Sequence, residues 1–222
     1  MTDEKRTYHK RRRAELEEQT RRRITESTVA LHGSVGPSRT SISAVAEHAG
    51  VRRSTVYRHF PDEPALFAAC SAHWSARNPP PDIDSWAAID DPAERLRAGI
   101  AEMYAFYRST EQMMANLHRD EVTMPVVKRL FGGFHDYQAA AADVLMRGRR
   151  CRGSSRRRVA AAIGHALSFP TWRSLANEQG LSDRQAAELM CRLVTVAADA
   201  EVSAPVRDRA TGSSPPQRRA TR

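Results

Sequence analysis

The side chains best suited to hydrogen-bonding chemistry lie together in one short segment, residues 52–59. This segment contains three arginines and one each of serine, threonine, tyrosine and histidine. A guanidinium can bond guanine O6 and N7 with two donors, and hydroxyl and imidazole groups can bond phosphate oxygens. The segment therefore offers the chemistry of nucleic-acid recognition, the alternative being the solvated face of a surface helix.

Other constellations in the chain do not support catalysis or metal binding. The triplet His118, Arg119 and Asp120 matches a kinase catalytic loop, but it lacks the following asparagine and an upstream glycine-rich loop. The eight histidines contain no HExxH spacing, and the three cysteines are odd in number and far apart. Cys151, between two arginines, allows a redox-sensing role or an ordinary loop position. We expect no enzyme activity, no metal and no cofactor.

The charge balance favours a polyanionic partner. The net charge is +9 and the isoelectric point is near 10.2. Such a charge favours an anionic partner, which could be DNA, RNA or a membrane surface, and it does not distinguish among the three. No run reaches the roughly 18 apolar residues that a membrane span needs, and the first thirty residues carry arginines in place of an apolar signal. We expect a cytoplasmic protein with no membrane contact.

Two short helices must position the polar segment. Ser41 is placed to cap the first of them, and Gly50 can adopt the left-handed conformation that ends it. The apolar face of this first helix comprises Ile42, Val45, Ala46 and Ala49. The second helix spans residues 52–59, and its inner face carries Val56 and Phe60 four residues apart. This arrangement is typical of a helix-turn-helix.

Flanking segments complete an N-terminal domain. A charged helix with basic clusters at residues 10–13 and 21–23 runs into Ile24 and Leu31, and Gly33, Gly36 and Pro37 end it. Asp62 caps the helix that follows Pro61. We therefore expect a three-helix DNA-binding domain over residues 1–61.

The remainder of the chain predicts longer helices. Pro92 begins one, a shorter element covers 111–119, and another helix covers 127–145 with Gly132 and Gly133 as a weak point. The basic stretch 147–158 is predicted to connect two helices, and its arginines could form a second nucleic-acid-binding patch or lie at solvated helix ends. The last two helices cover 159–177, kinked at Pro170, and 182–200. We expect an all-α fold with a larger helical domain over residues 62–200 and a disordered tail over 201–222.

The segment TSISAVAEHAGVRRSTVYRHFPDEPALF, residues 40–67, resembles the DNA-binding signature of the TetR family. The matching positions are Ile42, Val45, Ala46, Ala49, Gly50, Val51, Thr55, Tyr57, His59, Phe60 and Leu66. The resemblance covers the N-terminal third closely, and beyond it only the pattern of long helices fits. Arg52 stands where the family often has a capping serine or threonine, and Glu63 where it often has a phosphate-binding lysine. Arg52 could replace that lysine.

The resemblance implies a ligand-responsive repressor that reads a palindromic double-stranded DNA operator as a homodimer. The residues expected to contact DNA are Ser41, Arg52, Arg53, Ser54, Thr55, Tyr57, Arg58 and His59. Arg53 is expected to read a base, and Tyr57 and His59 look like phosphate anchors. The competing interpretations are a sequence-independent nucleic-acid binder and a constitutive repressor without an effector.

The same resemblance places an effector cavity and a dimer contact in the larger domain. Apolar side chains that could line a cavity for a small apolar effector are Met103, Tyr104, Tyr107, Met114, Phe131, Phe134 and Trp172. At helical spacing these residues could equally be packed core. The last two helices are expected to form the dimer contact through Ile163, Leu167, Leu189, Met190, Leu193 and Val194, although these residues could also belong to the core of one chain.

Overall fold

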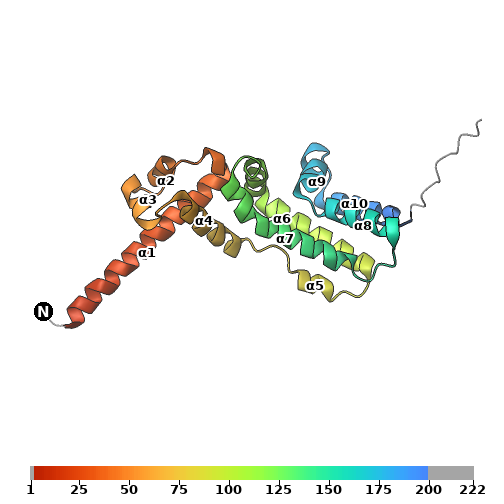
Figure 1. The fold of residues 1–222 in the computed structure, drawn as a ribbon, viewed down its shortest axis with the longest axis horizontal. Coiled ribbons are helices and arrows are strands. Elements are labelled where there is room, and N and C mark those ends of the chain that lie inside the picture. The colour runs from red at the N-terminus through yellow and green to blue at the C-terminus, as the bar shows by residue number, and fades with distance from the viewer. Residues whose placement is uncertain (1–2, 200–222) are drawn as a thin grey trace, which may run out of the picture.

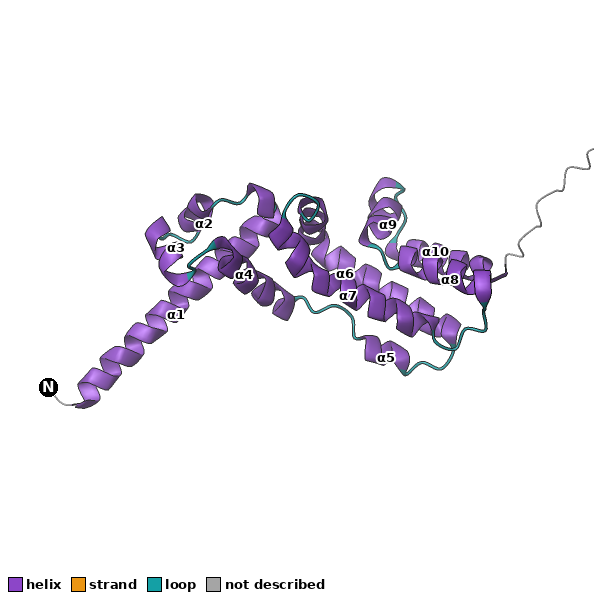
Figure 2. Ribbon diagram, in the orientation of Figure 1, coloured by secondary structure: helices purple, strands orange, loops and turns teal. Residues whose placement is uncertain are grey.

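The computed structural model describes residues 3–199, including the side chains of residues 6–198. Within this range the regular elements are all helical, and Figure 2 shows helices joined by loops. The expected all-α class is confirmed. No helix of the described range combines the length and apolarity needed to cross a membrane. The tail that we expected to be disordered, residues 201–222, lies outside the described residues.

The first unit is the expected three-helix domain. It consists of α1 (Asp3–Ser34), α2 (Ile42–His48) and α3 (Arg53–His59), with the short turn η1 (Pro37–Arg39) between α1 and α2. Its core side chains come from all three helices and from the start of α4 (Glu63–Arg77). The most deeply buried of them are Ile24, Val45, Val56, Phe60 and Leu66. The first half of α1 projects away from the rest of the molecule (Figure 1).

Local signals set the geometry between α2 and α3. The Ser41 hydroxyl accepts a hydrogen bond of 3.1 Å from the Ala44 N–H, which caps α2. Gly50 has a φ of 62°, a conformation that costs glycine little, and it lets the Val51 N–H bond the Ala46 carbonyl. The expected cap and turn are both present.

The second unit is a larger helical bundle. Its elements after α4 are α5 (Ile83–Ala87), α6 (Pro92–Asp120), α7 (Pro125–Met146), α8 (Gly153–Ala166), α9 (Phe169–Arg173), the π turn η2 (Ser174–Glu178) and α10 (Asp183–Asp199). Figure 1 shows α6 and α7 side by side, and α8 packs against α10. α4 joins the two units, because Leu66 lies in the first core whereas Trp74 packs against the second.

One expectation about the long helices is wrong, and the other holds. α6 runs unbroken from Pro92 to Asp120, so residues 111–119 are not a separate element. Its buried face continues through Thr110 and Met114, which gives the helix a packing partner along its whole length. α7 also passes through Gly132 and Gly133 without a break. Packing against α6 and α8 outweighs a glycine penalty of about 1 kcal/mol at each position.

The C-terminal helices also differ from expectation. α8 begins at Gly153, inside the stretch that we interpreted as a joint, and ends at Ala166. Pro170 lies in the first turn of α9, so it begins a new helix and does not kink a continuous one. The reason is that proline lacks an N–H, which makes it suitable either for a kink or for a helix start. The short helix α5, capped by Asp82 and anchored by the fully buried Trp86, was not anticipated.

Candidate functional site

α3 presents its polar side chains to solvent and its apolar side chains to the domain core. Of the residues expected to contact DNA, five in α3 and at its N-cap are exposed: Arg52, Arg53, Ser54, Tyr57 and Arg58. Thr55 and His59 are partly buried. Val56 and Phe60, on the opposite face, are 0% and 1% exposed. The helix is therefore held by one face and displays a dense set of donors on the other.

Residues at the two ends of this surface differ in how they are held. The Ser41 side chain is exposed, and its hydroxyl hydrogen stays available while its oxygen caps α2. Arg52 occupies the N-cap position of α3 but makes no capping bond. A positive side chain there opposes the helix dipole unless an anion such as a phosphate lies close by. Glu63 is exposed in the first turn of α4, where a carboxylate favours the dipole.

Arg21 positions the end of α3, a role that sequence reasoning missed. Its Nη1 donates a 3.0 Å hydrogen bond to the His59 carbonyl, and its guanidinium lies 4.5 Å from the centre of the Phe60 ring. These contacts fasten the C-terminal end of α3 to α1. The basic cluster at residues 21–23 marked Arg21 only as a charge, because its partner lies 38 residues along the chain.

His59 is less accessible than its neighbours. Its Nε2 is buried without a hydrogen-bond partner. Burial, and to a smaller extent the charge of Arg58, lower the pKa of His59 below its usual value. A phosphate contact through Nε2 would therefore require the ring to move, so Tyr57, whose side chain is 44% exposed, is the better placed of the two expected anchors.

A cavity of about 250 Å³ lies where the two units meet. We call it the junction cavity. Its wall combines residues of α1, η1, α4, α6 and α7 with the segment that follows α4. Six aromatic side chains line it: Phe67, Trp74, Phe106, Phe131, Phe134 and Tyr137. The polar lining residues are His32, Cys70, Ser71, Ser75 and Asn78.

The residues predicted to line an effector cavity fall into two groups, those that line the junction cavity and those packed in the core. Phe131 and Phe134 line the junction cavity. The other five are fully buried in the core of the second unit and are not part of that wall: Met103, Tyr104, Tyr107, Met114 and Trp172. Of the expected set, only Phe131 and Phe134 are thus placed to touch a molecule in this cavity, and the binding of an effector stays a prediction. The reason is that apolar spacing identifies the buried face of a helix but does not distinguish packed core from cavity wall.

Tyr107 shows what these core residues do. Its hydroxyl donates a 2.5 Å hydrogen bond to the Leu167 carbonyl and accepts one of 2.9 Å from Gln138. Burial raises the pKa of the Tyr107 hydroxyl well above its usual value. The residue thus ties α6 to the end of α8 and to α7.

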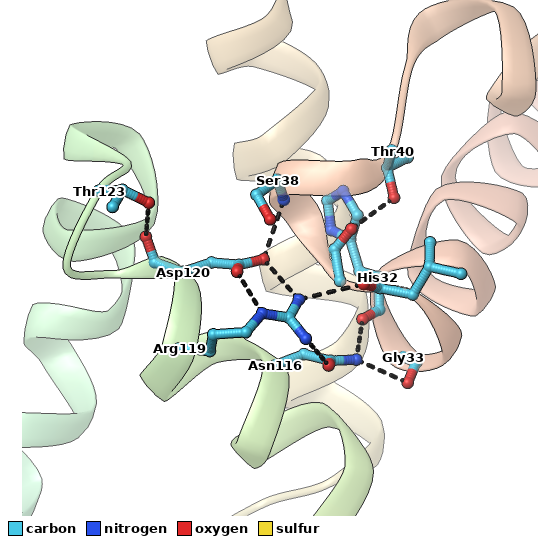
Figure 3. A network of polar contacts seen from close by, with 10 residues as sticks. His32, Gly33, Ser38, Thr40, Asn116, Arg119, Asp120 and Thr123 are labelled. Carbon is cyan, nitrogen blue, oxygen red and sulfur yellow. Dashed lines mark hydrogen bonds and ion pairs between the residues drawn. The ribbon is translucent and has the colours of Figure 1, made fainter.

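A polar network beside the junction cavity joins the last turn of α6 to the first unit (Figure 3). The Asn116 Nδ2 donates to the carbonyls of His32 and Gly33 at 2.9 Å each. Arg119 Nη2 donates to the Val35 carbonyl at 3.0 Å. Figure 3 shows Asp120 between Arg119 and Ser38, from which it accepts bonds of 2.7 Å (Arg119 Nε) and 2.9 Å (the Ser38 N–H). Two residues of the accidental kinase-like triplet therefore hold the units together.

Gly36 is required by this network. Its φ of 96° is a backbone conformation that residues with a side chain rarely adopt, and a Cβ there would overlap the Arg119 guanidinium.

The described residues contain no group of three or more histidine, cysteine, aspartate or glutamate side chains placed to hold a metal ion.

Comparisons with known proteins agree with this geometry. Residues 24–70 match the family model described as bacterial regulatory proteins of the tetR family. The N-terminal domain is a TetR-family DNA-binding domain. The matched range contains α2, α3 and the supporting part of α1. A comparison with curated proteins gave no match.

Solved structures share the fold of this chain beyond the DNA-binding domain. A TetR-like transcriptional regulator from Rhodococcus sp. RHA1 is 18% identical, with a TM-score of 0.60 over 82% of this chain and 97% of its own. A protein described as a TetR-family regulator from Mesorhizobium loti MAFF303099 is 19% identical, with a TM-score of 0.58 over 82% and 96%. A protein described as a transcriptional regulator from Saccharomonospora viridis, in complex with choline, is 17% identical, with a TM-score of 0.55 over 80% and 96%.

The residues expected at a dimer contact fall into a buried group and an exposed group. Four of them are buried within their own chain: Ile163, Leu167, Met190 and Val194. Leu189 and Leu193 are 44% and 42% exposed on α10, and Val196, which was not anticipated, is 63% exposed. Within the expected set only Leu189 and Leu193 are exposed to a second copy, and the dimer contact itself stays a prediction. The apolar stripe of α10 is wide enough both to pack against the core of its own chain and to leave apolar side chains exposed, and residue spacing alone does not distinguish the two sides.

Proposed function

We propose that this TetR-type protein is a transcriptional repressor that binds a palindromic DNA operator as a homodimer and releases it when a small apolar molecule fills the junction cavity. The DNA-binding unit corresponds to residues 1–61 and the regulatory unit to residues 62–200. The observation that carries the proposal is α3, a helix anchored by Val56 and Phe60 with five donor-rich side chains exposed. A helix of this kind can enter the major groove of DNA.

Roles on α3 follow from side-chain chemistry. Arg53, in the first turn, can bond both acceptors of a guanine, whereas Tyr57 can donate to a phosphate. The remaining polar residues of the set, Ser41, Ser54, Thr55, Arg58 and His59, would contribute phosphate contacts around them. A sequence-independent binder would need the charge but not this ordered arrangement.

Selection of binding sites from a random DNA pool tests the proposal, followed by affinity measurements on the selected and scrambled sequences. Arg53→Ala should weaken the selected sequence by about 1 to 3 kcal/mol and relax the preference at one base pair of each half-site. Tyr57→Phe should weaken all sequences evenly. Arg129→Ala, an exposed arginine on α7, serves as the matched control. If the wild type selects no palindrome, or if Arg53→Ala weakens every sequence equally, sequence-specific recognition through α3 is refuted.

Dimerisation is proposed because one seven-residue helix contacts too few base pairs for useful specificity. The exposed apolar side chains of α10, Leu189, Leu193 and Val196, lie on one helical face. On the adjoining helix α8, Ala160, Ala161 and Gly164 are exposed, and nothing lies within 4 Å of where a Cβ on Gly164 would be. Small residues allow a second copy to approach closely, and an isologous contact would bury the same face twice.

Sedimentation velocity tests this contact. Leu193→Glu should raise the dimer dissociation constant by more than about a hundredfold, because the two-fold axis buries the added charge twice. Val122→Glu, at a position 82% exposed in the loop between α6 and α7, is the control and should leave the dimer intact. Equal sedimentation of Leu193→Glu and the wild type would place the dimer contact elsewhere.

Release by an effector is supported by the position of the junction cavity. Its wall includes Val29 and His32 of α1, so a bound molecule touches the unit that carries α3. A ligand shifts the protein between two conformations only by the amount that it prefers one of them, and tenfold release requires about 1.4 kcal/mol. The Saccharomonospora viridis structure holds choline, which supports a small-molecule role for this fold.

A further inference from the structure

The junction cavity has a chemical character that narrows what it can hold. Its volume of about 250 Å³ lies just below the range of about 300 to 1,000 Å³ that is usual for drug-sized ligands. Its lining residues include no aspartate, glutamate, lysine or arginine. An anion that entered would lose its hydration without gaining an opposite charge, which is strongly unfavourable, and a cation would gain only the attraction of the aromatic rings, with no carboxylate to neutralise it. The six aromatic rings of the wall favour a flat, uncharged partner.

His32 supplies a polar feature inside this apolar wall. The residue is 4% exposed, and its Nε2 is buried without a hydrogen-bond partner, so a ligand group reaches this atom only after the ring turns towards the cavity. A buried polar atom without a partner costs free energy that a correctly placed ligand group would recover. Burial lowers the pKa of His32 to about 4, so its ring is neutral at physiological pH.

The contacts of Cys70 decide which kind of ligand group fits His32. The Cys70 Sγ lies 3.1 Å from the Phe67 carbonyl oxygen, which can only accept a hydrogen bond, so the thiol hydrogen is directed there. Sγ also lies 3.6 Å from His32 Nδ1, and this contact then requires Nδ1 to be the donor. A neutral imidazole with its proton on Nδ1 has a lone pair on Nε2. His32 therefore needs a hydrogen-bond donor.

We propose that the junction cavity binds a small uncharged aromatic molecule with one hydrogen-bond donor, such as a phenolic hydroxyl, and that the His32 ring turns towards the cavity so that this donor bonds Nε2. The inference rests on the proposed function, because it names the effector class of the same cavity. His32 belongs to α1, and its own carbonyl accepts a bond from Asn116 of α6. The effector would thus contact α1 at the residue where the polar network joins the two units.

Calorimetric titration of the full-length protein with four probes tests this assignment. The probes are 4-phenylphenol, 4-methylbiphenyl, biphenyl-4-carboxylate and choline. The first two have the same shape and differ only by the donor. We expect 4-phenylphenol to bind about tenfold more tightly than 4-methylbiphenyl, the equivalent of one net hydrogen bond. We expect the carboxylate and choline to show no binding. Equal affinities for the first pair, tight binding of either ion, or no binding of either biphenyl would overturn the proposal.

The variant His32→Phe locates the donor contact. It should bind 4-methylbiphenyl as the wild type does and lose the tenfold advantage of 4-phenylphenol. An advantage that persists in a folded His32→Phe protein would overturn the assignment to His32, and the probe pair on the wild type decides the ligand class if this variant does not fold. Neither measurement involves DNA. Binding of 4-phenylphenol as described, with unchanged operator affinity, would therefore support the ligand assignment while refuting release by an effector.

Discussion

Asp120 offers a direct test of how the regulatory unit holds the DNA-binding unit. Its side chain is 3% exposed and accepts hydrogen bonds from Arg119 Nε at 2.7 Å, Arg119 Nη2 at 3.1 Å and the Ser38 N–H at 2.9 Å. Asp120→Asn keeps the shape but replaces one acceptor oxygen with an NH₂ group. That group must face a donor, either Arg119 or the Ser38 N–H. The substitution therefore loses bonds without opening a cavity.

The expected cost follows from these bonds. A hydrogen bond to a charged group contributes about 1.5 to 3 kcal/mol, and the partial exposure of Arg119, 43%, argues for the lower part of that range. We expect Asp120→Asn to lower the free energy of unfolding by about 2 kcal/mol at neutral pH. For a chain of this length the melting temperature should fall by about 4 to 8 °C.

The effect should also depend on pH. Burial favours the neutral carboxyl group, but hydrogen bonds from Arg119 and Ser38 favour the carboxylate more strongly, and the net effect lowers the pKa of Asp120. A carboxyl group with a lowered folded-state pKa stabilises the protein above its unfolded-state pKa, and this stabilisation is lost as the pH falls. The difference between wild type and Asp120→Asn should therefore be constant near neutral pH and shrink below about pH 4.

Urea unfolding across this pH range measures both effects. Asp143→Asn is the control, because Asp143 is exposed on α7 and its substitution should change stability by less than about 0.5 kcal/mol. Equal losses in the two variants would show that the network contributes no stability. A difference that grows as the pH falls would refute the role assigned to the ionised carboxylate.

Three further predictions concern α1, α7 and the core. Deleting residues 1–13 removes six lysine and arginine side chains and two acidic ones. If this part of α1 touches DNA, the slope of log affinity against log salt concentration should become shallower by about 0.9 per lost phosphate contact, and the selected sequence should not change. An unaltered slope would show that the segment makes no such contact. Gly132→Ala should raise the free energy of unfolding, measured by urea titration, by about 0.5 to 1 kcal/mol, because the position is helical and an added Cβ meets nothing within 4 Å. A lower free energy of unfolding in the variant would contradict this. Tyr107→Phe should lower the free energy of unfolding by about 1 kcal/mol, because it removes the hydrogen bond to the Leu167 carbonyl. It should leave the affinity for 4-phenylphenol unchanged. A changed affinity would indicate that Tyr107 contacts the ligand.

The features predicted correctly from sequence depend on neighbours only a few residues apart. The Ser41 cap reaches Ala44, and the turn at Gly50 requires only the backbone freedom of that residue. The apolar face of α2 and the inner face of α3 also follow from helical periodicity, because side chains three or four residues apart share a face. The helix-turn-helix and its exposed donors were for this reason predictable without coordinates.

The helix boundaries in the second unit were less predictable because the same residue permits two outcomes. Pro170 suits a kink as well as a first turn, and the structure places it at the start of α9. Gly132 weakens an isolated helix, yet packing on both sides of α7 keeps it helical. Local propensity is a small term, and burial of a whole helical face exceeds it.

The helical class, the polar helix α3 and the set of apolar residues that must leave water follow from the amino-acid sequence. Which of these apolar residues pack against each other, and which enclose a space, depends on how the helices pack. Tyr107 and Phe134 have the same kind of periodic position, but one bonds Leu167 in the core and the other lines the junction cavity. The bonds of Arg21 to α3 and of Asp120 to η1 join residues 38 and 82 positions apart. Such partners are brought together by the packing of whole helices, which no short window of sequence specifies.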